Sequence, residues 1–305
     1  MKFSIVVPVY NVEAYLDNCL ASLQAQDFAD FEVICVNDGS TDRSREILSA
    51  WASKMPQIRL IDRENGGLSA ARNTGLAAAT GDYVVFVDSD DWVESSMLSR
   101  LAEETRDEDM LCFACRKSDS GATDTLLPEQ SDGWSYYSRH ALEHREVPFV
   151  CVWQRCYRRE FLMDNNLRFR EGVLHEDNEF TPRACMKAES IKVIPDVIYN
   201  YRVRPGSIMT TRGMRSKESL ITIGNELSEL FAKELNIDKT IAYQALTQCY
   251  QMAFIDNTRE EDHQLKLLID WHCYRRVSRT KPRHRINYSL LRISPILFRF
   301  INHMF

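Results

Sequence analysis

The chain has 305 residues, of which 44% are hydrophobic and 27% charged, and its formal net charge is −6. These fractions are ordinary for a folded protein with a large buried core, and the length exceeds that of one average domain. The negative charge argues against a nucleic-acid-binding protein, because neutralising phosphates requires a basic face. We therefore expect one α/β domain with a helical extension and no nucleic-acid partner.

The cysteines and the N-terminus indicate the compartment. Nine cysteines without the spacing of a secreted domain are typical of reduced thiols in a cytoplasmic protein. The first apolar run is interrupted by Pro8, Asn11 and Glu13 before a signal sequence would be complete. No stretch reaches the ~18 apolar residues of a spanning helix. We expect a cytoplasmic protein that does not cross a membrane.

The first 116 residues alternate β-rich runs with amphipathic segments. The expected strands are 3–7, 31–36, 58–61, 83–87 and 110–114, and the expected helices are 12–24, 42–54 and 68–79. Strands that are apolar throughout, each followed by a helix, predict a parallel sheet covered by helices on both faces. In such sheets, ligands bind beyond the carboxyl ends of the strands.

The second half of the chain reads differently. Residues 117–133 are polar and predict a loop or lobe boundary. Helices near 158–165 and 177–187 and a strand at 191–201 follow, and the pattern is helical after Ser207. We therefore divide the chain into a domain at 1–210, with halves 1–116 and 117–210, and a C-terminal helical region at 211–305.

The end of the chain is basic and apolar. Residues 272–305 contain no acidic residue, and their basic residues are Arg275, Arg276, Arg279, Lys281, Arg283, Arg285, Arg292 and Arg299. The apolar residues of this segment are Leu290, Leu291, Ile293, Ile296, Leu297, Phe298, Phe300, Ile301, Met304 and Phe305. This combination predicts peripheral contact of residues 280–305 with an anionic membrane, at the inner face of the cytoplasmic membrane. The alternative is a terminal helix packed on the domain.

Two motifs follow the first two expected strands. The first strand ends in PVYN (8–11), and the chain contains neither G-x-G-x-x-G nor G-x-x-x-x-G-K-[ST], which excludes the two commonest nucleotide-binding loops. The second strand ends in NDGSTD (37–42). The Asp38 carboxylate only accepts hydrogen bonds, so it suits a base or ribose that presents donors. The alternative for this motif is an ordinary turn and helix cap.

Two further motifs follow. ENGG (64–67) leads into a helix that carries Arg72, and paired glycines let the backbone approach a ligand closely, unless the loop is merely a turn. DSDD (88–91) places three carboxylates directly after a buried strand, which is costly unless a cation or donors compensate. Oxygen ligands of this kind suit Mg²⁺ or Mn²⁺ bridging to a pyrophosphate. The alternative is a solvated acidic turn.

Taken together, these motifs resemble family 2 glycosyltransferases, which have the GT-A fold. The motifs are PVYN, NDGSTD, ENGG followed by ARNTG, GDYVVFVDSDD and HEDNEF. The resemblance implies a Rossmann-like mixed sheet with helices on both faces, as in enzymes of bacterial capsular and exopolysaccharide synthesis. One departure is Asn37, where many relatives carry Asp ahead of the Asp38 equivalent.

The resemblance also implies roles for individual residues. It places Asp88 and Asp90 as the DxD metal pair, and a set of residues around the nucleotide: Pro8, Tyr10, Asn11, Asp38 and Arg63. We expect further donor contacts from Gly67, Arg72, Asp88, Ser89 and Arg204.

HEDNEF (175–180) looks like the family's later motif, whose Asp supplies the catalytic base. The resemblance selects Asp177 over Glu176, whereas on the residues alone a Glu-Asp pair at a helix start is an ordinary first turn. The base removes the acceptor hydroxyl's proton while that oxygen attacks the anomeric carbon opposite the leaving diphosphate, so the sugar carbon inverts. A metal ion offsets the charge on the leaving group.

Two features after residue 150 have two interpretations each. Trp153 and Tyr157 either stack on an acceptor sugar or belong to the core. Arg202 or Arg204 either meets the donor diphosphate or is an ordinary surface charge.

The sequence therefore predicts an inverting glycosyltransferase that uses a nucleotide diphosphate sugar, with UDP as the expected nucleotide. The acceptor is a saccharide or polyprenyl-linked oligosaccharide of cell-surface polysaccharide synthesis. One alternative is a nucleotidyltransferase acting on sugar phosphates, but the Gly-rich loop expected after the first strand is missing. The other is a non-catalytic nucleotide-sugar-binding module, which the intact Asp90 and Asp177 disfavour. The oligomeric state is not encoded in any of these motifs.

Overall fold

The structure is a computed structural model that describes residues 1–123, 132–143, 150–204, 213–234, 237, 239–278 and 282–298. The strands are β1 (Phe3–Val9), β2 (Phe31–Asp38), β3 (Ile58–Arg63), β4 (Tyr83–Phe86), β5 (Trp92–Val93), β6 (Met110–Lys117), β7 (Arg155–Arg158) and β8 (Ile191–Tyr201). The helices are α1 (Leu16–Gln24), α2 (Ser44–Ala52), α3 (Leu68–Ala78), α4 (Met97–Glu104), α5 (Gly133–Glu143), α6 (Arg159–Asp164), α7 (Asp177–Lys187), α8 (Met214–Lys233), α9 (Lys239–Ala253), α10 (Arg259–Leu268), α11 (Trp271–Ser278) and α12 (Pro282–Ile293).

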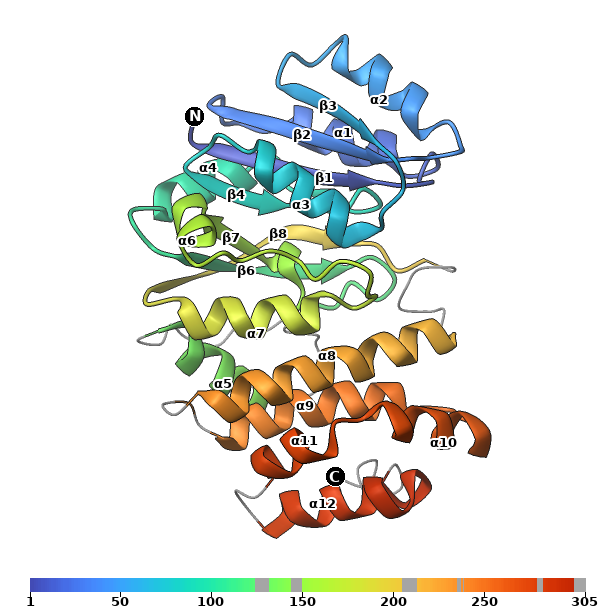
Figure 1. The fold of residues 1–305 in the computed structure, drawn as a ribbon. Coiled ribbons are helices and arrows are strands. Elements are labelled where there is room, and N and C mark those ends of the chain that lie inside the picture. Colours follow the sequence, from blue (N-terminus) through green and yellow to red (C-terminus); the bar gives the residue numbers. More distant parts are fainter. Residues whose placement is uncertain are drawn as a thin grey trace.

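These strands form one eight-stranded sheet in the order β3-β2-β1-β4-β7-β6-β8-β5 (Figure 1). β1 pairs in parallel with β2 and β4, and β2 pairs in parallel with β3. The parallel arrangement expected for the first four strands is therefore correct. It brings the carboxyl ends of these strands, and the motifs that follow them, to one edge of the sheet.

The rest of the sheet is not a continuation of the parallel series. β7 lies between β4 and β6 and runs antiparallel to both, β6 pairs in parallel with β8, and β5 runs antiparallel to β8. The five strands expected within residues 3–116 all run in the same direction, but β7 separates β4 from β6, so they do not form one continuous parallel sheet. The mixed sheet of the GT-A class is confirmed. The sequence of β7, RCYR, has only four residues and two charges, so it gave no strand signal.

Helices cover both faces of the sheet, as expected. Alternate residues of β1 face opposite cores: Ile5 packs with α1 and α4, whereas Val6 packs with α3 and α7. α1 begins at Leu16 rather than near residue 12, because the backbone N–H groups of Tyr15 and Leu16 both bond to the Val12 carbonyl in a preceding turn.

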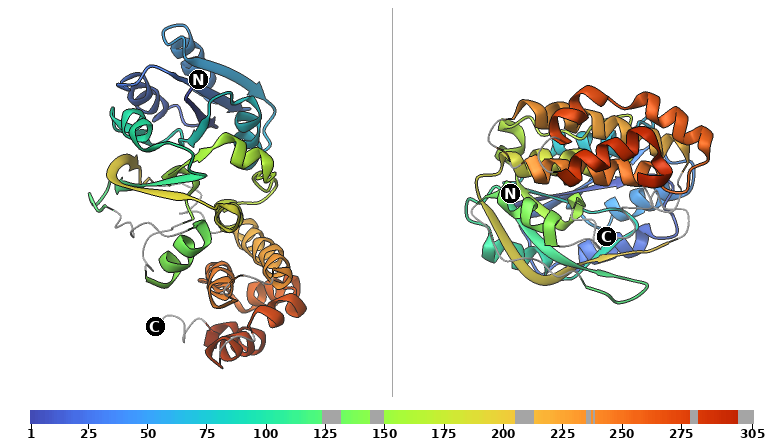
Figure 2. Two further views of the ribbon diagram at one scale, coloured as in Figure 1. Left: turned by 90° about the vertical axis from the view of Figure 1, so that its left-hand side faces the viewer. Right: turned by 90° about the horizontal axis from the view of Figure 1, so that it is seen from below.

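The C-terminal helices pack beneath the sheet and continue one of its cores (Figures 1 and 2). The cluster that contains Val6 extends through α5 and α7 to Leu291 and Phe298. The domain boundary that we predicted near residue 210 falls within 205–212, outside the described residues. No helix of the described chain is long and apolar enough to span a membrane.

The basic tail is only partly available for membrane contact. Leu291 and Phe298 are fully buried, as the packed-helix alternative requires, whereas Ile293 is 77% exposed. Several predicted tail residues lie outside the described part of the chain: Arg279, Lys281, Arg299, Phe300, Ile301, Met304 and Phe305.

Candidate active site

The loops after β1 and β2 are joined side by side. The Asn11 side-chain oxygen accepts hydrogen bonds from the backbone N–H groups of Thr41 (2.8 Å) and Asp42 (3.3 Å). The Ser40 hydroxyl accepts from the Asn11 N–H at 3.2 Å. Asn11 has a positive φ of 50°, a conformation that asparagine tolerates better than most residues. Asn11 therefore holds the loops after β1 and β2 together.

Asn37 has a structural part in the same loop. Its side-chain amide donates to Asp62 at 2.9 Å, and its oxygen accepts from the Ser40 N–H at 3.1 Å. An asparagine provides both the donor and the acceptor, so the departure from the family pattern suits this position.

Asp38 organises the turn that carries the paired glycines. Its side chain is almost fully buried, forms an ion pair with Arg63, and accepts from the N–H groups of Gly66 (3.0 Å) and Gly67 (2.8 Å). Gly67 has φ +87°, which strains residues with a side chain. The predicted donor residues Asp38, Arg63 and Gly67 thus form one constellation.

The other predicted donor residues of this edge differ in accessibility. Tyr10 is 48% exposed at the end of β1, whereas Pro8 is buried within that strand and Ser89 is buried beyond β4. Of these three side chains, Tyr10 is the one that projects into solvent, where a nucleotide can reach it.

The acidic segment after β4 contains one carboxylate that belongs to the interior. Asp91 is 1% exposed and accepts from the Tyr199 hydroxyl and the Arg202 N–H, both at 2.7 Å. The Tyr199 hydroxyl in turn accepts from the Asp88 N–H at 3.1 Å. Burial, reinforced by Asp88 and Asp90, raises the pKa of Asp91 well above its usual range. Asp91 therefore fixes the acidic segment to β8 and to the residue that follows it.

Asp90 pairs with the chain that follows β8. The Arg204 Nε donates to its carboxylate at 2.6 Å, and the Arg202 Nε donates to its carbonyl at 2.7 Å. Both guanidinium groups lie over the Tyr15 ring, at 5.3 Å for Arg202 and 5.2 Å for Arg204. Burial and the neighbouring Asp88 raise the pKa of Asp90, and Arg204 opposes that shift. Arg204 thus lies beside the predicted metal ligand.

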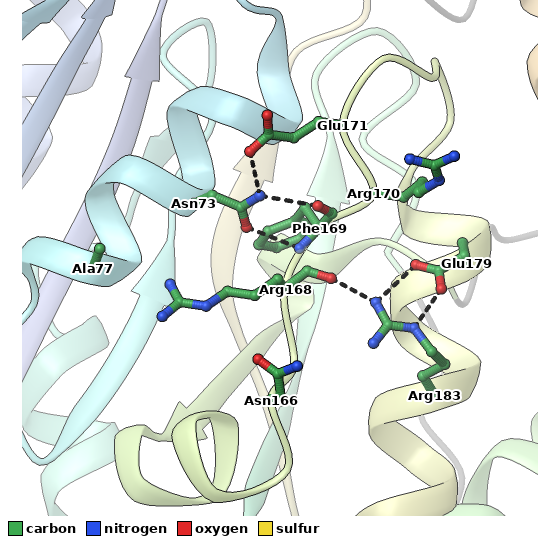
Figure 3. Close-up of a pocket in the computed structure, with 9 residues that line it drawn as sticks. All are labelled: Asn73, Ala77, Asn166, Arg168, Phe169, Arg170, Glu171, Glu179 and Arg183. Atoms are coloured by element: carbon green, nitrogen blue, oxygen red, sulfur yellow. Dashed lines mark hydrogen bonds and ion pairs between the residues drawn. The ribbon is translucent and has the colours of Figure 1, made fainter.

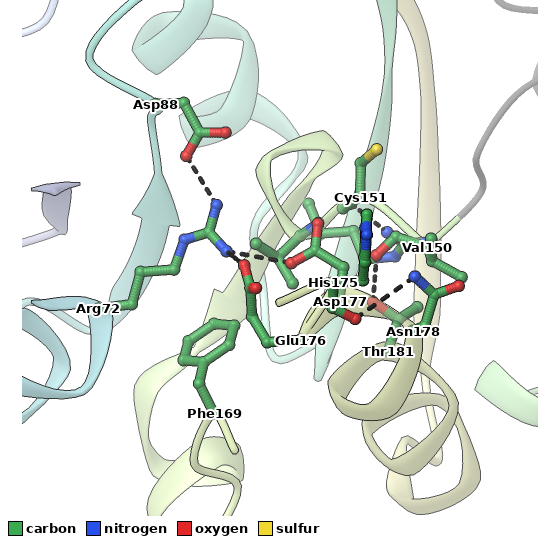
Figure 4. A network of polar contacts seen from close by, with 12 residues as sticks. Arg72, Asp88, Val150, Cys151, Phe169, His175, Glu176, Asp177, Asn178 and Thr181 are labelled. Atoms are coloured by element: carbon green, nitrogen blue, oxygen red, sulfur yellow. Dashed lines mark hydrogen bonds and ion pairs between the residues drawn. The ribbon is translucent and has the colours of Figure 1, made fainter. Parts of the chain in front are cut away.

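A buried arginine connects the acidic segment to the predicted base (Figure 4). Arg72 is 1% exposed, and its guanidinium binds Asp88 at 2.7 Å, Glu176 at 2.5 Å and Asp177 at 3.0 Å. We predicted that Arg72 contacts the nucleotide. In the structure the side chain is enclosed, and its two terminal nitrogens bind three carboxylates.

Asp177 lies at the first residue of α7, beside Val152. Its carboxylate accepts from the Val152 N–H at 3.3 Å, in addition to the bond from Arg72. Burial raises the pKa of Asp177 to about 7, with Glu176 and Asp88 adding to the shift and Arg72 opposing it. A carboxylate with a pKa near neutrality is matched to accepting a proton in general base catalysis.

The segment before Asp177 is held by a contact with the C-terminal helical region. His175 has φ +64°, and its Nε2 lies 2.7 Å from the Ser216 hydroxyl of α8. A non-glycine residue in this region of backbone space is strained and is held by its surroundings. The first helix of the C-terminal region thus helps to fix the loop of the predicted base.

Asn73, the neighbour of Arg72, fixes the support beneath that arginine. Its side chain donates to the Phe169 carbonyl and accepts from the Phe169 N–H, both at 2.9 Å. The Phe169 ring faces the Arg72 guanidinium at 5.4 Å and stacks on Phe180 at 4.2 Å. The ARNTG motif therefore positions Arg72 through Phe169.

An open hollow of about 640 Å³ lies on the outer side of this support (Figure 3). Most of its charged side chains are paired with the protein: Arg183 binds Glu179 at 2.8 Å, Arg170 binds Glu226 at 3.0 Å, and Glu171 accepts from Asn73 at 3.0 Å. The Arg168 guanidinium contacts the Met163 sulfur at 3.8 Å. The hollow is thus a surface of the support and contains none of the predicted site residues.

The donor set at Asp88 and Asp90 fits a cation only in part. No cluster of three or more His, Cys, Asp or Glu side chains suited to a metal occurs within the described ranges. Mg²⁺, however, is commonly held by one or two carboxylates together with substrate phosphates. The two carboxylates, whose proximity raises the pKa of Asp90, match that shared mode of binding rather than a complete protein site.

Two participants were missed in the sequence. Tyr199 and the Val152 N–H meet the predicted residues from distant parts of the chain, and neither belongs to a motif that indicates its partner. Glu176 belongs to HEDNEF, but that motif does not indicate its bond from Arg72. Trp153 and Tyr157 are 6% and 0% exposed, so the core interpretation is correct for both. Trp153 stacks on Tyr199 at 4.5 Å, behind the acidic segment.

Comparisons with known proteins agree with this arrangement. Residues 4–165 match the family described as Glycosyl transferase family 2. The uncharacterized glycosyltransferase EpsJ of Bacillus subtilis is 40% identical over 215 residues, which cover 67% of this chain and 62% of EpsJ. The chain thus spans less than two thirds of that relative's length.

Solved structures show the same fold. Staphylococcus aureus TarS 1–349 in complex with UDP-GlcNAc superposes with a TM-score of 0.74 at 24% identity, covering 98% of this chain and 89% of that chain. The mannosyltransferase PcManGT from Pyrobaculum calidifontis, in complex with GDP-Man and Mn²⁺, gives a TM-score of 0.60 at 17% identity, covering 98% and 87%. The chain has the GT-A fold and belongs to glycosyltransferase family 2.

Proposed function

We propose that this protein is an inverting glycosyltransferase that moves a sugar from a UDP-sugar to a saccharide or polyprenyl-linked acceptor in cell-surface polysaccharide synthesis. The observation that carries the proposal is Asp177, a carboxylate with a pKa of about 7 that one buried arginine joins to Asp88. This arrangement couples a proton acceptor to the segment that faces the donor.

The donor side of the proposal rests on the edge formed by the parallel strands. The nucleotide lies against Tyr10 and the Asp38 constellation, whose loops are held by the protein's own hydrogen bonds before any ligand arrives. Such preorganisation reduces the ordering cost of binding. The TarS structure contains UDP-GlcNAc, which is consistent with UDP as the nucleotide.

The chemical step requires a base on the acceptor side of the sugar. Asp177 accepts the acceptor hydroxyl's proton while the oxygen forms the new glycosidic bond and the bond to the diphosphate breaks. Arg72 and the Val152 N–H hold the carboxylate in place without occupying it completely. Attack opposite the leaving group inverts the sugar carbon.

The diphosphate needs positive charge. Asp90 and Asp88 would hold Mg²⁺ or Mn²⁺ jointly with the donor, and a cation there stabilises the charge of the leaving group. Arg204 pairs with Asp90, and we propose that its guanidinium turns to the diphosphate when the donor binds. Asp90→Asn is expected to abolish transfer.

The proposed setting is the inner face of the cytoplasmic membrane, where a polyprenyl-linked acceptor is accessible. The support is the basic and apolar composition of residues 280–305, together with the exposure of Ile293 and its neighbours. Membrane contact of this kind is peripheral.

A thermal-shift screen tests the donor. Bound ligand stabilises the fold by mass action, so a UDP-sugar with Mn²⁺ should raise the melting temperature more than GDP- or ADP-sugars do. The shift should shrink in Asp38→Asn, as its weaker binding requires, and persist in Asp30→Asn, an exposed carboxylate near the chain's start. No shift with any nucleotide sugar contradicts the proposal.

Product analysis distinguishes the activities. A glycosyltransferase releases UDP from a UDP-sugar, and some UDP is released even when water replaces the acceptor. A nucleotidyltransferase instead consumes a nucleoside triphosphate and a sugar 1-phosphate. Tight UDP-sugar binding without hydrolysis or transfer over a broad acceptor panel indicates a non-catalytic module.

A further inference from the structure

Exposed apolar side chains gather at one end of the molecule. Of the ten large hydrophobic side chains that are most exposed among the described residues, six belong to the C-terminal helices: Leu267, Leu268, Ile286, Ile293, Ile296 and Leu297. Scattered apolar residues are normal on a protein surface, whereas a concentrated group marks an interaction site.

α12 presents two opposite faces. Ile286, Leu290 and Ile293 follow each other at spacings of four and three residues, so they share one face of the helix. Ile286 is 55% and Ile293 77% exposed, and Ile296 and Leu297, each 49% exposed, follow directly. Leu291 on the other side is buried in the core that α12 shares with α11. Leu290 is partly buried against that core, so the outer apolar face is exposed at Ile286 and Ile293.

A basic hollow of about 590 Å³ adjoins this face, between α11 and α12. It is lined by Arg275, Ser278, Arg285, Tyr288, Ser289 and Arg292. Arg285, Ser289 and Arg292 again follow at spacings of four and three, which puts their guanidinium and hydroxyl groups along the flank of the apolar face.

The segment that lines the hollow carries no negative charge of its own. Residues 271–305 contain eight lysines and arginines and no acidic residue. The nearest preceding carboxylate, Asp270, accepts from the N–H groups of His272 (3.0 Å) and Cys273 (3.1 Å) and thereby caps α11. Guanidinium and hydroxyl groups in this density suit phosphate oxygens.

We propose that the α11–α12 face, defined by Arg275, Arg285 and Arg292 with Ile286 and Ile293, docks on the anionic headgroups of a lipid bilayer. The hollow receives lipid phosphates and the isoleucines enter the acyl boundary. A second copy of the chain fits this face poorly, because a two-fold contact would oppose two sets of arginines. The inference rests on the membrane contact proposed above and assigns it to particular residues.

The assignment changes which part of the tail touches lipid. Leu291 and Phe298 stay in the core, so docking uses the outer face of a packed helix rather than the insertion of a free one. α12 lies at the end of the molecule opposite β3 and α2 (Figures 1 and 2). Docking through it leaves the nucleotide edge of the sheet open to the aqueous side.

Vesicle sedimentation with the full chain tests the proposal. Vesicles of phosphatidylcholine containing phosphatidylglycerol should bind the protein, phosphatidylcholine alone should not, and salt should weaken binding. Because each basic side chain contributes about fivefold at an anionic surface, Arg285→Gln with Arg292→Gln should weaken binding roughly 25-fold. The matched control, Arg106→Gln with Lys54→Gln, removes two exposed charges far from α12 and should bind like wild type.

The apolar part has its own test. Ile293→Ser should weaken vesicle binding about tenfold, whereas Met163→Ser, at an exposed site on α6, should not. Equal binding of the arginine variant and wild type overturns the proposal, as does binding that does not need phosphatidylglycerol. A wild-type dimer that Ile293→Ser converts to a monomer, measured by light scattering, also overturns it in favour of self-association.

The docking surface and the catalytic proposal fail separately. UDP release is measured on the same protein without vesicles. Wild-type protein that releases UDP but never sediments contradicts the docking surface alone. Protein that sediments on anionic vesicles but releases no UDP from any UDP-sugar contradicts the catalytic proposal alone.

Discussion

The negative charge of Asp38 and that of a second group of carboxylates are compensated in different ways. Asp38 has an arginine and two backbone N–H groups to itself, so its negative charge is matched within its own loop. The second group, the strand-end cluster, contains Asp88, Asp90, Asp91, Glu176 and Asp177. Among the residues that the structure describes, Arg72 and Arg204 form ion pairs with it.

The difference supports the proposal that the proton transfer takes place at the strand-end cluster. Burial raises the pKa of Asp90, Asp91 and Asp177, and the negative charge of neighbouring carboxylates adds to the shift. Such a cluster is prepared to take up a proton or a cation. The balanced loop around Asp38 is instead prepared to hold its shape, which suits recognition of the nucleotide.

Removing the proton acceptor should have the largest effect. Asp177→Asn keeps the shape of the side chain but cannot take a proton, so kcat should fall by about 10²–10⁴. Steady-state UDP release with an acceptor measures the loss. Asp164→Asn, an exposed change on α6, is the control, and a kcat for Asp177→Asn near that of the control excludes Asp177 as the base.

Removing Arg72, whose guanidinium is shared by three carboxylates, should have the second largest effect. Arg72→Gln leaves three carboxylates without their positive partner, and the free energy of unfolding should fall by about 3–5 kcal/mol in urea titrations. Arg72 stabilises the ionised form of Asp177, so its loss should raise that pKa and move the acidic limb of kcat/KM to higher pH. Arg72→Lys retains the charge and should show a smaller change in both. Unchanged stability and pH profile would remove Arg72 from the account.

Disturbing the balanced loop should affect binding rather than catalysis. In Asp38→Asn an amide N–H₂ faces the Gly66 or Gly67 N–H, and an unmade hydrogen bond of this kind costs about 1–3 kcal/mol. We expect the Kd for a UDP-sugar, measured by calorimetry, to rise about 10- to 100-fold. The kcat at saturating donor should change much less. A selective loss of kcat would assign Asp38 to the chemical step instead.

The smallest effect is expected at Arg204. Arg204→Gln removes the partner of Asp90 and the cation proposed for the diphosphate, and we expect donor affinity to fall about fivefold. The pKa of Asp90 should rise further, since Arg204 opposes its upward shift. Donor titrations with and without Mn²⁺ measure the change. Tighter donor binding in the variant would mean that Arg204 blocks the site.

The edge of the sheet that carries the motifs could be predicted from the sequence, because it depends on the order of the elements along the chain. Each motif follows a strand, and parallel strands bring their carboxyl ends to one edge, so the position of Asp38, Arg63 and Asp88 at that edge follows from the order of elements. The insertion of β7 between β4 and β6 could not be predicted, since four residues with two charges carry no strand pattern.

The network beneath the motifs could not be predicted either. Arg72 and Asp177 are separated by 105 positions, and Asp88 and Tyr199 by 111, so no periodicity links them. The sequence suggested that Arg72 points to the ligand because its helix follows the glycine turn. The direction of the guanidinium is set by its contacts with Phe169 and with the three carboxylates, and these groups come together only in the folded chain.

The most direct test of the central claim is the titration of the Asp177 carboxyl itself, by NMR of protein labelled at aspartate Cγ. The signal is assigned by its absence in Asp177→Asn, and no substrate is needed. We expect a midpoint at about pH 7, with the carboxylate losing its proton as the pH rises through that value. A midpoint near the ordinary aspartate value of about 4 would contradict the account.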